Sequence, residues 1–336
     1  MQDEMTAFNE RVNLARYHGQ LEGHYESFFV RANHPSRPLA FWIRYTIFSP
    51  KGLPGNALGE LWAVFFNGEN NKHVAAKEEY PLDECLFDRQ SFQVRVGKAT
   101  LGPHDLQGAI ESRGGAIAWK LSYRGDSKPI LLLPLNLYQG GFPAAKSLVS
   151  LPMARFNGEL TVNGEAINIT NWLGSQNHNW GRRHTDLYAW GQVAGFDTHP
   201  DSFLELATAR LRIGPIWTPP MTLLVLRHGQ KEYTLTGLMQ AMKAKGSFKY
   251  FTWDFKSETA QVGIEGTISA PRGAFVGLNY HNPPGGSKHC LNSKIAGCTL
   301  HLRDKLSGTT EIMETKNRAA FEILTDDTEH GIKISA

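Results

Sequence analysis

The chain has 336 residues, 41% of them hydrophobic, with 35 lysine and arginine residues against 32 acidic ones. The formal charge of +3 is small and spread along the chain, which argues against nucleic acid or an anionic membrane surface as the partner. The first residues lack the basic and apolar pattern of a secretion signal, and no apolar run reaches the roughly 18 residues of a membrane span. We therefore expect a cytoplasmic protein without an integral membrane span.

Cysteine number and motif content bear on cofactors. The three cysteines, Cys85, Cys290 and Cys298, are odd in number, which favours reduced thiols over a disulfide scaffold. Histidines lie near the last two, but the spacing does not match structural zinc sites. The chain also lacks the motifs of a phosphate-binding loop, a dinucleotide fold and a serine-hydrolase elbow. We expect neither a metal nor a cofactor.

The first half of the chain has the pattern of an antiparallel β protein. After an opening from Phe8 to Tyr17 that could form a helix, short alternating segments are broken by glycine, proline and asparagine. The expected strands are rich in aromatic and β-branched residues and cover Leu39 to Phe48, Glu60 to Phe66, Ser91 to Val96 and Ala116 to Tyr123. A hairpin is expected from Glu159 to Ile169, with Asn163-Gly164 as its turn.

The second half repeats this pattern. A strand from Leu187 to Val193 would place Tyr188, Trp190 and Gln192 on one face. Further candidate strands are Phe203 to Ile213, Met221 to Arg227, Glu232 to Leu238, Phe248 to Phe255, Val262 to Ile268, Phe275 to Tyr280, Lys294 to Leu302 and Ala319 to Leu324. Chain length predicts two closely joined domains, residues 1–165 and 166–336. Sandwich and barrel architectures both fit so many short strands.

The stretch from Gly174 to Trp190 concentrates imidazoles, guanidinium groups, indoles and a carboxylate. Polar heads beside large apolar rings are expected to line a partly enclosed pocket, and pockets favour domain junctions. His178 is a candidate catalytic residue, and the candidate binding residues of this stretch are Trp180, Arg183, His184, Tyr188 and Trp190. In extended backbone His178 and Trp180 would meet the same ligand, although a histidine among asparagines can serve only as a hydrogen-bonding post.

Two carboxylates are candidate proton donors. Asp186 falls at the strand mouth on the face of Tyr188, where it can serve a ligand or pair with Arg182 or Arg183 and fix the loop. Glu205 falls on a strand face with apolar neighbours, where burial would raise its pKa unless that face is open to solvent.

Charged and aromatic residues are also mixed in strand-like runs of the first half. Glu26, Trp42 and Arg44 are candidate binding residues there, with Glu26 and Arg44 expected to form an internal ion pair of mainly structural value. Because the Gly174 to Trp190 stretch has the character of a loop and a strand mouth, we expect His178→Ala and Asp186→Asn to weaken ligand capture while folding stays nearly intact.

Seven short blocks spread over most of the chain carry a family resemblance: Gly23 to Ser27, Gly59 to Val64, Ala145 to Leu148, Ala154 to Gly158, Gln176 to His184, Tyr188 to Trp190 and Cys290 to Lys294. They resemble the hydroxyneurosporene synthase (carotenoid 1,2-hydratase) and AttH-like family, whose wider relatives include tocopherol cyclases and fungal decalin-forming cyclases. The resemblance implies an all-β fold of two lipocalin-like antiparallel β-barrels in tandem, with few short helices. It also implies a ligand in a barrel or at their junction, and no redox cofactor.

The same resemblance implies non-redox hydration, cyclisation or isomerisation of a lipophilic isoprenoid, polyene or polyketide-like molecule. His178 and Trp180 match the His-x-Trp pair of carotenoid hydratases, but the partner Tyr-x-Asp pair has no match, and Glu205 near its place lacks the tyrosine. A catalyst that only shapes its substrate needs no acid. Two alternatives stay open: a non-catalytic carrier of lipophilic molecules, and a stress or interaction protein with filled barrels.

Overall fold

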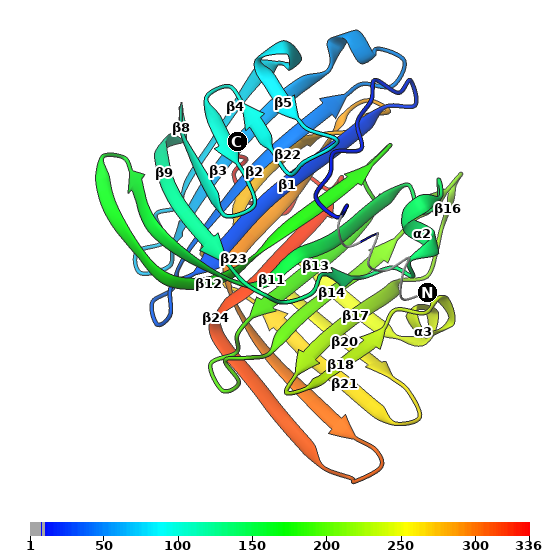
Figure 1. Ribbon diagram of the computed structural model, residues 1–336. Helices are drawn as coiled ribbons and strands as arrows, with labels where there is room; N and C mark the ends of the chain where they lie inside the picture. Colours follow the sequence, from blue (N-terminus) through cyan, green and yellow to red (C-terminus); the bar gives the residue numbers. More distant parts are fainter. Residues whose placement is uncertain (1–7, 9–10) are drawn as a thin grey trace.

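The computed structural model describes residue 8 and residues 11–336. Its strands form two large curled antiparallel sheets, one nearly closed into a barrel and one a half-barrel (Figure 1). In the described part of the chain the α-helices α2 (Asn136–Gln139) and α3 (Leu238–Lys243) are short. The expected all-β fold of two lipocalin-like sheets is confirmed. None of the helices in the described residues is long and apolar enough to cross a membrane.

The first sheet has 12 strands in the order β4-β3-β2-β1-β12-β11-β9-β8-β7-β6-β5, with β10 paired to β11. The strands are β1 (His24–Asn33), β2 (Leu39–Ser49), β3 (Leu58–Asn67), β4 (Val74–Pro81), β5 (Cys85–Phe87), β6 (Val94–Val96), β7 (Ala99–Leu101), β8 (Asp105–Ser112), β9 (Gly115–Arg124), β10 (Ile130–Leu131), β11 (Ala145–Val162) and β12 (Glu165–Gly181).

The second sheet has 10 strands in the order β18-β17-β14-β13-β24-β23-β21-β20-β19, with β22 paired to β23. They are β13 (Leu187–Ala194), β14 (Phe203–Arg210), β17 (Met221–His228), β18 (Lys231–Leu235), β19 (Lys245–Lys249), β20 (Thr252–Glu258), β21 (Val262–Ser269), β22 (Val276–His281), β23 (Ser287–Asp304) and β24 (Thr310–Thr325). A separate ribbon joins β15 (Arg212–Ile213) to β16 (Ile216–Trp217).

Strands β1, β2 and β3 are buried on both faces, which explains their nearly continuous aromatic and aliphatic composition. On β2 the inward residues Phe41, Ile43 and Tyr45 join the core of the first sheet. The alternate residues of β2 face the other way, because successive side chains of a strand point to opposite faces. Trp42 of this outward set packs in one cluster with residues of the second sheet. The inward side chains thus form the core of the first sheet, and the outward ones pack against the second sheet.

We call the boundary between the outward face of β1–β3 and the second sheet the seam. Its apolar part joins Phe29 and Trp42 to Trp190 of β13. A polar part lies deeper, where the Arg31 Nε donates to Gln192 Oε1 over 2.7 Å and the Asn33 Nδ2 donates to the Lys294 carbonyl over 2.6 Å. Hydrogen bonds between buried groups on both sheets fix how the sheets meet.

The hairpin turn forms as expected, with Asn163 at φ 51° and Gly164 at φ 86°, the left-handed pair that a two-residue hairpin requires. The predicted domain boundary at residue 165 falls at this hairpin. Both β11 and β12 belong to the first sheet, and the chain passes to the second between Gly181 and Leu187.

Several expected elements differ from the structure. The expected strand from Phe203 to Ile213 ends at Arg210 in β14, and Arg212 and Ile213 belong to the separate β15–β16 ribbon. The expected strand from Phe248 to Phe255 is wrong, because a turn with Phe251 at φ 76° divides it into β19 and β20. The expected opening helix is not formed over residues 11–17, which make turns and irregular backbone, while residues 9 and 10 lie outside the described residues. The backbone N–H groups of Arg16 and Tyr17 bind a carboxylate instead of helical carbonyls.

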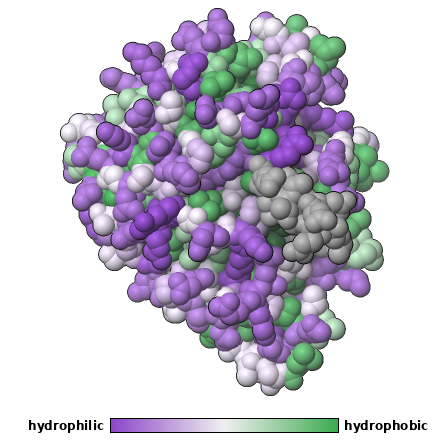
Figure 2. Space-filling view, viewed as in Figure 1, coloured by the Kyte–Doolittle hydropathy of each residue, from purple (hydrophilic) through white to green (hydrophobic). Residues whose placement is uncertain are grey.

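The face in Figure 2 is mostly hydrophilic, and its hydrophobic residues are scattered rather than gathered into one large patch. Scattered apolar residues are ordinary on protein surfaces. The apolar chemistry that bears on function lies inside, at the seam.

Candidate functional site

A cavity of about 230 Å³ lies at the seam, and we call it the seam cavity. The first sheet contributes side chains from β1, β2, β11 and β12, and the second contributes side chains from β13, β14, β17, β22 and β24. The cavity lining includes Tyr25, Trp42, Arg44, Leu132, Leu137, Lys146, Asn179, His184, Tyr188, Trp190, Ala207, Met221, Leu223, Tyr280 and Glu322. Junctions between packed units are preferred places for ligand sites.

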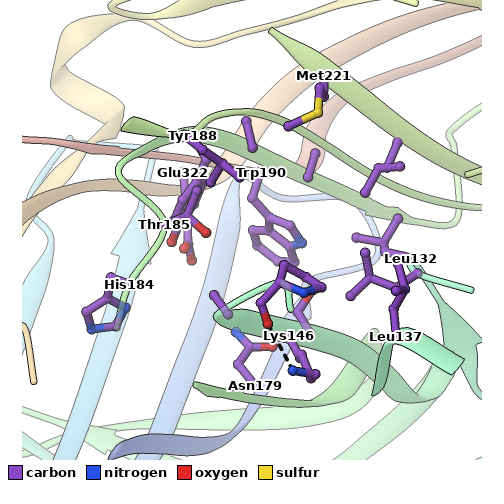
Figure 3. Close-up of a pocket in the computed structure, with 18 of the residues that line it drawn as sticks. Leu132, Leu137, Lys146, Asn179, His184, Thr185, Tyr188, Trp190, Met221 and Glu322 are labelled. Carbon is purple, nitrogen blue, oxygen red and sulfur yellow. Dashed lines mark hydrogen bonds between the residues drawn. The ribbon is translucent and has the colours of Figure 1, made fainter. Parts of the chain in front are cut away.

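The cavity has two chemically different ends (Figure 3). His184, Thr185, Tyr188 and Glu322 lie on one side of Trp190, and the aliphatic residues Leu132 and Leu137 lie on the other. Lys146 lies near the floor, where its Nζ donates to the Pro143 carbonyl over 2.9 Å. An apolar body with one polar end would match this division.

His184 is held as a neutral imidazole. Its ring stacks on Tyr25 with 4.0 Å between centroids, and its Nε2 lies 3.1 Å from the His281 carbonyl oxygen. Burial, followed by the charge of Arg44, lowers the pKa of His184 to about 3. The ring therefore adds no positive charge to the polar end at neutral pH.

The phenols and the carboxylate of the polar end also have defined protonation states or partners. Burial raises the pKa of Tyr188 and of Tyr280 well above the ordinary value, so both hydroxyls keep their protons. The Glu322 Oε1 accepts hydrogen bonds from the Lys294 Nζ over 2.5 Å and from the Asn292 Nδ2 over 3.0 Å. The polar end thus offers neutral hydroxyl donors beside a paired carboxylate.

Glu205 lies behind the cavity wall and is 2% exposed. Its Oε1 accepts from the Trp190 Nε1 over 2.7 Å and its Oε2 from the Gln192 Nε2 over 2.8 Å. Burial raises its pKa to about 8, although these two hydrogen bonds oppose the shift. Glu205 has the desolvated carboxyl expected from the strand pattern, but it orients the Trp190 indole and is absent from the cavity lining.

This raised pKa predicts a loss of stability at high pH. Between pH 4.5 and 8 the folded protein keeps a proton on Glu205 that the unfolded chain releases, so stability falls as pH rises through this window. The free energy of unfolding of the wild type should fall by about 2 kcal/mol between pH 6 and pH 8.5, and Glu205→Gln should abolish this fall. Urea unfolding at both pH values measures it, with the exposed Glu165→Gln as control. Equal pH slopes for Glu205→Gln and the wild type would contradict the assignment.

His178 belongs to a second, separate network at the mouth of the first barrel. The ring is fully buried, stacks on Phe28 with 4.1 Å between centroids, and places Nε2 2.8 Å from Glu26 Oε1. Glu26 also accepts hydrogen bonds from the backbone N–H groups of Arg16 and Tyr17. Burial alone would raise the pKa of Glu26, but the hydrogen bonds from His178 and His24 outweigh it and lower the pKa to about 2.

The expectation that His178 and Trp180 face the ligand together is corrected. On β12 it is Asn179 that lines the cavity, and alternation turns its two neighbours to the opposite face. Trp180 packs there against Tyr138, with Arg16 over its ring at 5.2 Å. The structure thus supports a hydrogen-bonding role for His178, away from the cavity.

The expected ion pair between Glu26 and Arg44 is not formed. Across the β1–β2 pairing Glu26 is opposite Ile47 whereas Arg44 is opposite Phe29, so the two charges lie on opposite faces of the sheet. Glu26 therefore joins the His178 network, and Arg44 reaches the seam cavity with Trp42.

Asp186 and Arg183 also lie outside the cavity lining. The Asp186 Oδ2 accepts from the Arg212 backbone N–H over 2.9 Å, and its Oδ1 lies 3.6 Å from the Arg183 Nη1. Of the two roles considered for Asp186, the structure therefore supports the one in which the carboxylate fixes the loop. Of the residues predicted for the site, the cavity gathers Trp42, Arg44, His184, Tyr188 and Trp190.

Sequence reasoning missed several lining residues. Glu322 and Tyr280 fall within strands that were expected, and a charged residue between Phe321 and Ile323 is the signal that could have marked Glu322. Leu132 and Leu137 come from the connection around α2, which has no periodic pattern to reveal its position, and Lys146 comes from the start of β11.

A possible metal-binding group lies elsewhere. His199, His228 and Glu311 bring one ligand atom each to within 4.8 Å of one another, and none of the three lines the seam cavity. Cys290 and Cys298 do not belong to this group. Both are buried free thiols, and burial raises the pKa of each.

Comparisons with known proteins agree with this geometry. A family model for tocopherol cyclase-like proteins matches residues 143–323, just over half of the chain. An AttH-like protein from Nitrosomonas europaea has 12% identity over 92% of this chain and 94% of its own, with a TM-score of 0.57. Kievitone hydratase from Nectria haematococca has 11% identity over 92% and 93%, with a TM-score of 0.55. The protein CghA, in complex with Sch210972, has 11% identity over 94% and 97%, with a TM-score of 0.53. No curated protein matches the sequence.

Proposed function

Because the chain belongs to the tocopherol cyclase-like family, we propose that it binds a lipophilic isoprenoid, polyene or polyketide-like molecule in the seam cavity and promotes its non-redox hydration, cyclisation or isomerisation. The observation that carries the proposal is the cavity itself. Its aliphatic walls meet a cluster of indole, phenol, imidazole and guanidinium groups at one end. A cavity of this kind binds an extended apolar molecule in one orientation.

Aromatic faces supply one part of the chemistry. Hydration and cyclisation of an alkene develop positive charge on carbon, and the aromatic side chains of Trp190, Trp42 and Tyr188 border the space in which it would develop. Aromatic faces attract cations, and pre-positioned groups stabilise a transition state without reorganising. The walls also fold the chain of the substrate, so that reacting carbons meet in a productive geometry.

Hydrogen bonding to the reacting group falls to the hydroxyl groups of the polar end. Tyr188 and Tyr280 line the cavity as neutral phenols, whereas the acid of raised pKa, Glu205, is bonded to the Trp190 and Gln192 side chains. We therefore assign Tyr188 as the hydroxyl that donates a hydrogen bond to the reacting group and Glu205 as a positioning residue. Cyclisation by shape alone would need neither.

Tyr188→Phe is expected to lower turnover by about 100-fold, since the ring keeps its place while the hydroxyl is lost. Ligand affinity should change little, because the indole and aliphatic walls remain. Tyr233→Phe, outside the cavity lining, is the matched control. Unchanged turnover in Tyr188→Phe would remove the phenol from the mechanism and favour catalysis by shape.

A carrier is the second candidate, and the position of Glu205 behind Trp190 favours it, because a carrier needs no acid facing its ligand. Mass spectrometry of lipophiles that copurify with the protein, followed by incubation with each purified compound, separates the two functions. Hydration adds one water to the mass, and cyclisation or isomerisation changes retention and absorbance at constant mass. Bound compounds that come back unchanged would establish the carrier.

A further inference from the structure

The polar end of the seam cavity contains a buried cation without a partner. Arg44 is 6% exposed, and no hydrogen bond or ion pair joins its guanidinium to any of the described residues. Its nearest defined contact is the ring of Tyr280, whose centroid lies 4.4 Å from Cζ. Burying an unpaired charge is costly, so proteins normally pair it.

Two more hydrogen-bond donors of the same wall have no acceptor. The Trp42 Nε1 and the Tyr280 Oη are buried and lack partners among the described residues, as does the Arg44 Nε. All three side chains line the seam cavity. Buried polar groups are nearly always satisfied, so three unsatisfied donors on one wall indicate an absent acceptor.

The neighbouring carboxylates already have cations of their own. Glu322 is paired with the Lys294 Nζ over 2.5 Å, and Glu60 is paired with the Lys77 Nζ over 2.7 Å. His184, the other basic group of this end, is neutral because its pKa is low. Burial lowers the pKa of Arg44, but the nearby Tyr280, Glu60 and Glu322 raise it overall, so Arg44 is a buried positive charge at the polar end without an ion-pair partner among the described residues.

We propose that the polar end of the seam cavity binds an anionic oxygen group of the lipophilic ligand, such as a carboxylate or enolate, through Arg44. Trp42 and Tyr280 donate hydrogen bonds to the same group, and the apolar tail extends towards Leu132 and Leu137. A planar guanidinium is well suited to bind two oxygen atoms of one anion. This inference rests on the proposed function, because it assumes that a lipophile occupies the cavity.

The test compares two probes of equal length, a long-chain fatty acid and the matching primary alcohol, by calorimetric titration at neutral pH. The wild type should bind the acid about 10-fold or more tightly than the alcohol. Arg44→Gln should bind the acid no more tightly than the alcohol, and Tyr280→Phe should lose part of the preference. The exposed Arg37→Gln, whose guanidinium pairs with Glu69, is the matched control and should keep the preference.

Thermal unfolding tests whether Arg44→Gln changes binding by destabilising the fold. Removing an unpaired buried charge should leave the melting temperature of Arg44→Gln unchanged or higher, and a large decrease would contradict the unpaired state. Equal affinity of the wild type for acid and alcohol would overturn the role of Arg44 while leaving lipophile binding intact. Failure of the wild type to bind either probe would overturn the proposed function and this inference together.

Discussion

Glu26→Ala should destabilise the fold by about 3–5 kcal/mol, the cost of removing one partner from a buried, hydrogen-bonded charge pair. The carboxylate binds His178 and His24 on the first barrel and the backbone N–H groups of Arg16 and Tyr17 from the preceding segment. Removal would leave these donors buried without an acceptor. Urea unfolding at neutral pH measures the effect, and Glu22→Ala, exposed in the same segment, is the matched control.

The low pKa of Glu26 sets the pH dependence of this effect. Because its folded pKa is about 2, below that of an unfolded glutamate, the stabilisation is fully present above about pH 4.5 and is lost as pH falls towards 2. The difference between wild type and Glu26→Ala should therefore shrink in acid. A constant difference down to pH 2 would show that packing, not charge pairing, explains the loss.

The same contacts change the expectation for His178→Ala. A loop histidine would tolerate the change, but the structure buries this ring completely between Phe28 and the Glu26 carboxylate. We therefore expect loss of stability, and we do not expect a selective loss of ligand binding.

Ala207→Phe should reduce ligand affinity by about 10-fold or more, because the new ring would occupy the space beside Trp190. Ala207 is only partly buried, so the ring can extend into the cavity and the melting temperature should change little. Fluorescent lipophile displacement measures the affinity. Ala166→Phe, at an exposed position of β12, is the matched control.

Retention of full affinity by Ala207→Phe would place the ligand elsewhere. Loss of affinity together with a large drop in melting temperature would leave the site undecided for this variant, so Leu223→Trp on the neighbouring strand β17 provides a second block of the same space.

Sequence patterns predicted the strands well where one face is buried and turns are marked, as in the Asn163-Gly164 hairpin. They failed where burial is two-sided. On β1, on β2 and on β12 from Trp172 onward almost every residue is buried, so composition does not tell which face meets the barrel interior and which meets the second sheet.

That ambiguity explains the errors at the site. The dense stretch does reach the cavity through Asn179, His184, Tyr188 and Trp190, but a single step along β12 turns His178 to the other side. Pairing register also separates Glu26 from Arg44. Register and the contacts between sheets come from tertiary structure, which local patterns do not encode.

Photolabelling can locate a lipophile bound in the space between the two sheets. A lipophilic diazirine probe, bound and then irradiated, should label the lining residues Met221, Leu223 and Leu137, and the labelling should fall in Ala207→Phe. Label found instead in the barrel interior, at residues such as Phe41 or Trp119, or spread over the surface, would show that the lipophile does not bind in the seam cavity.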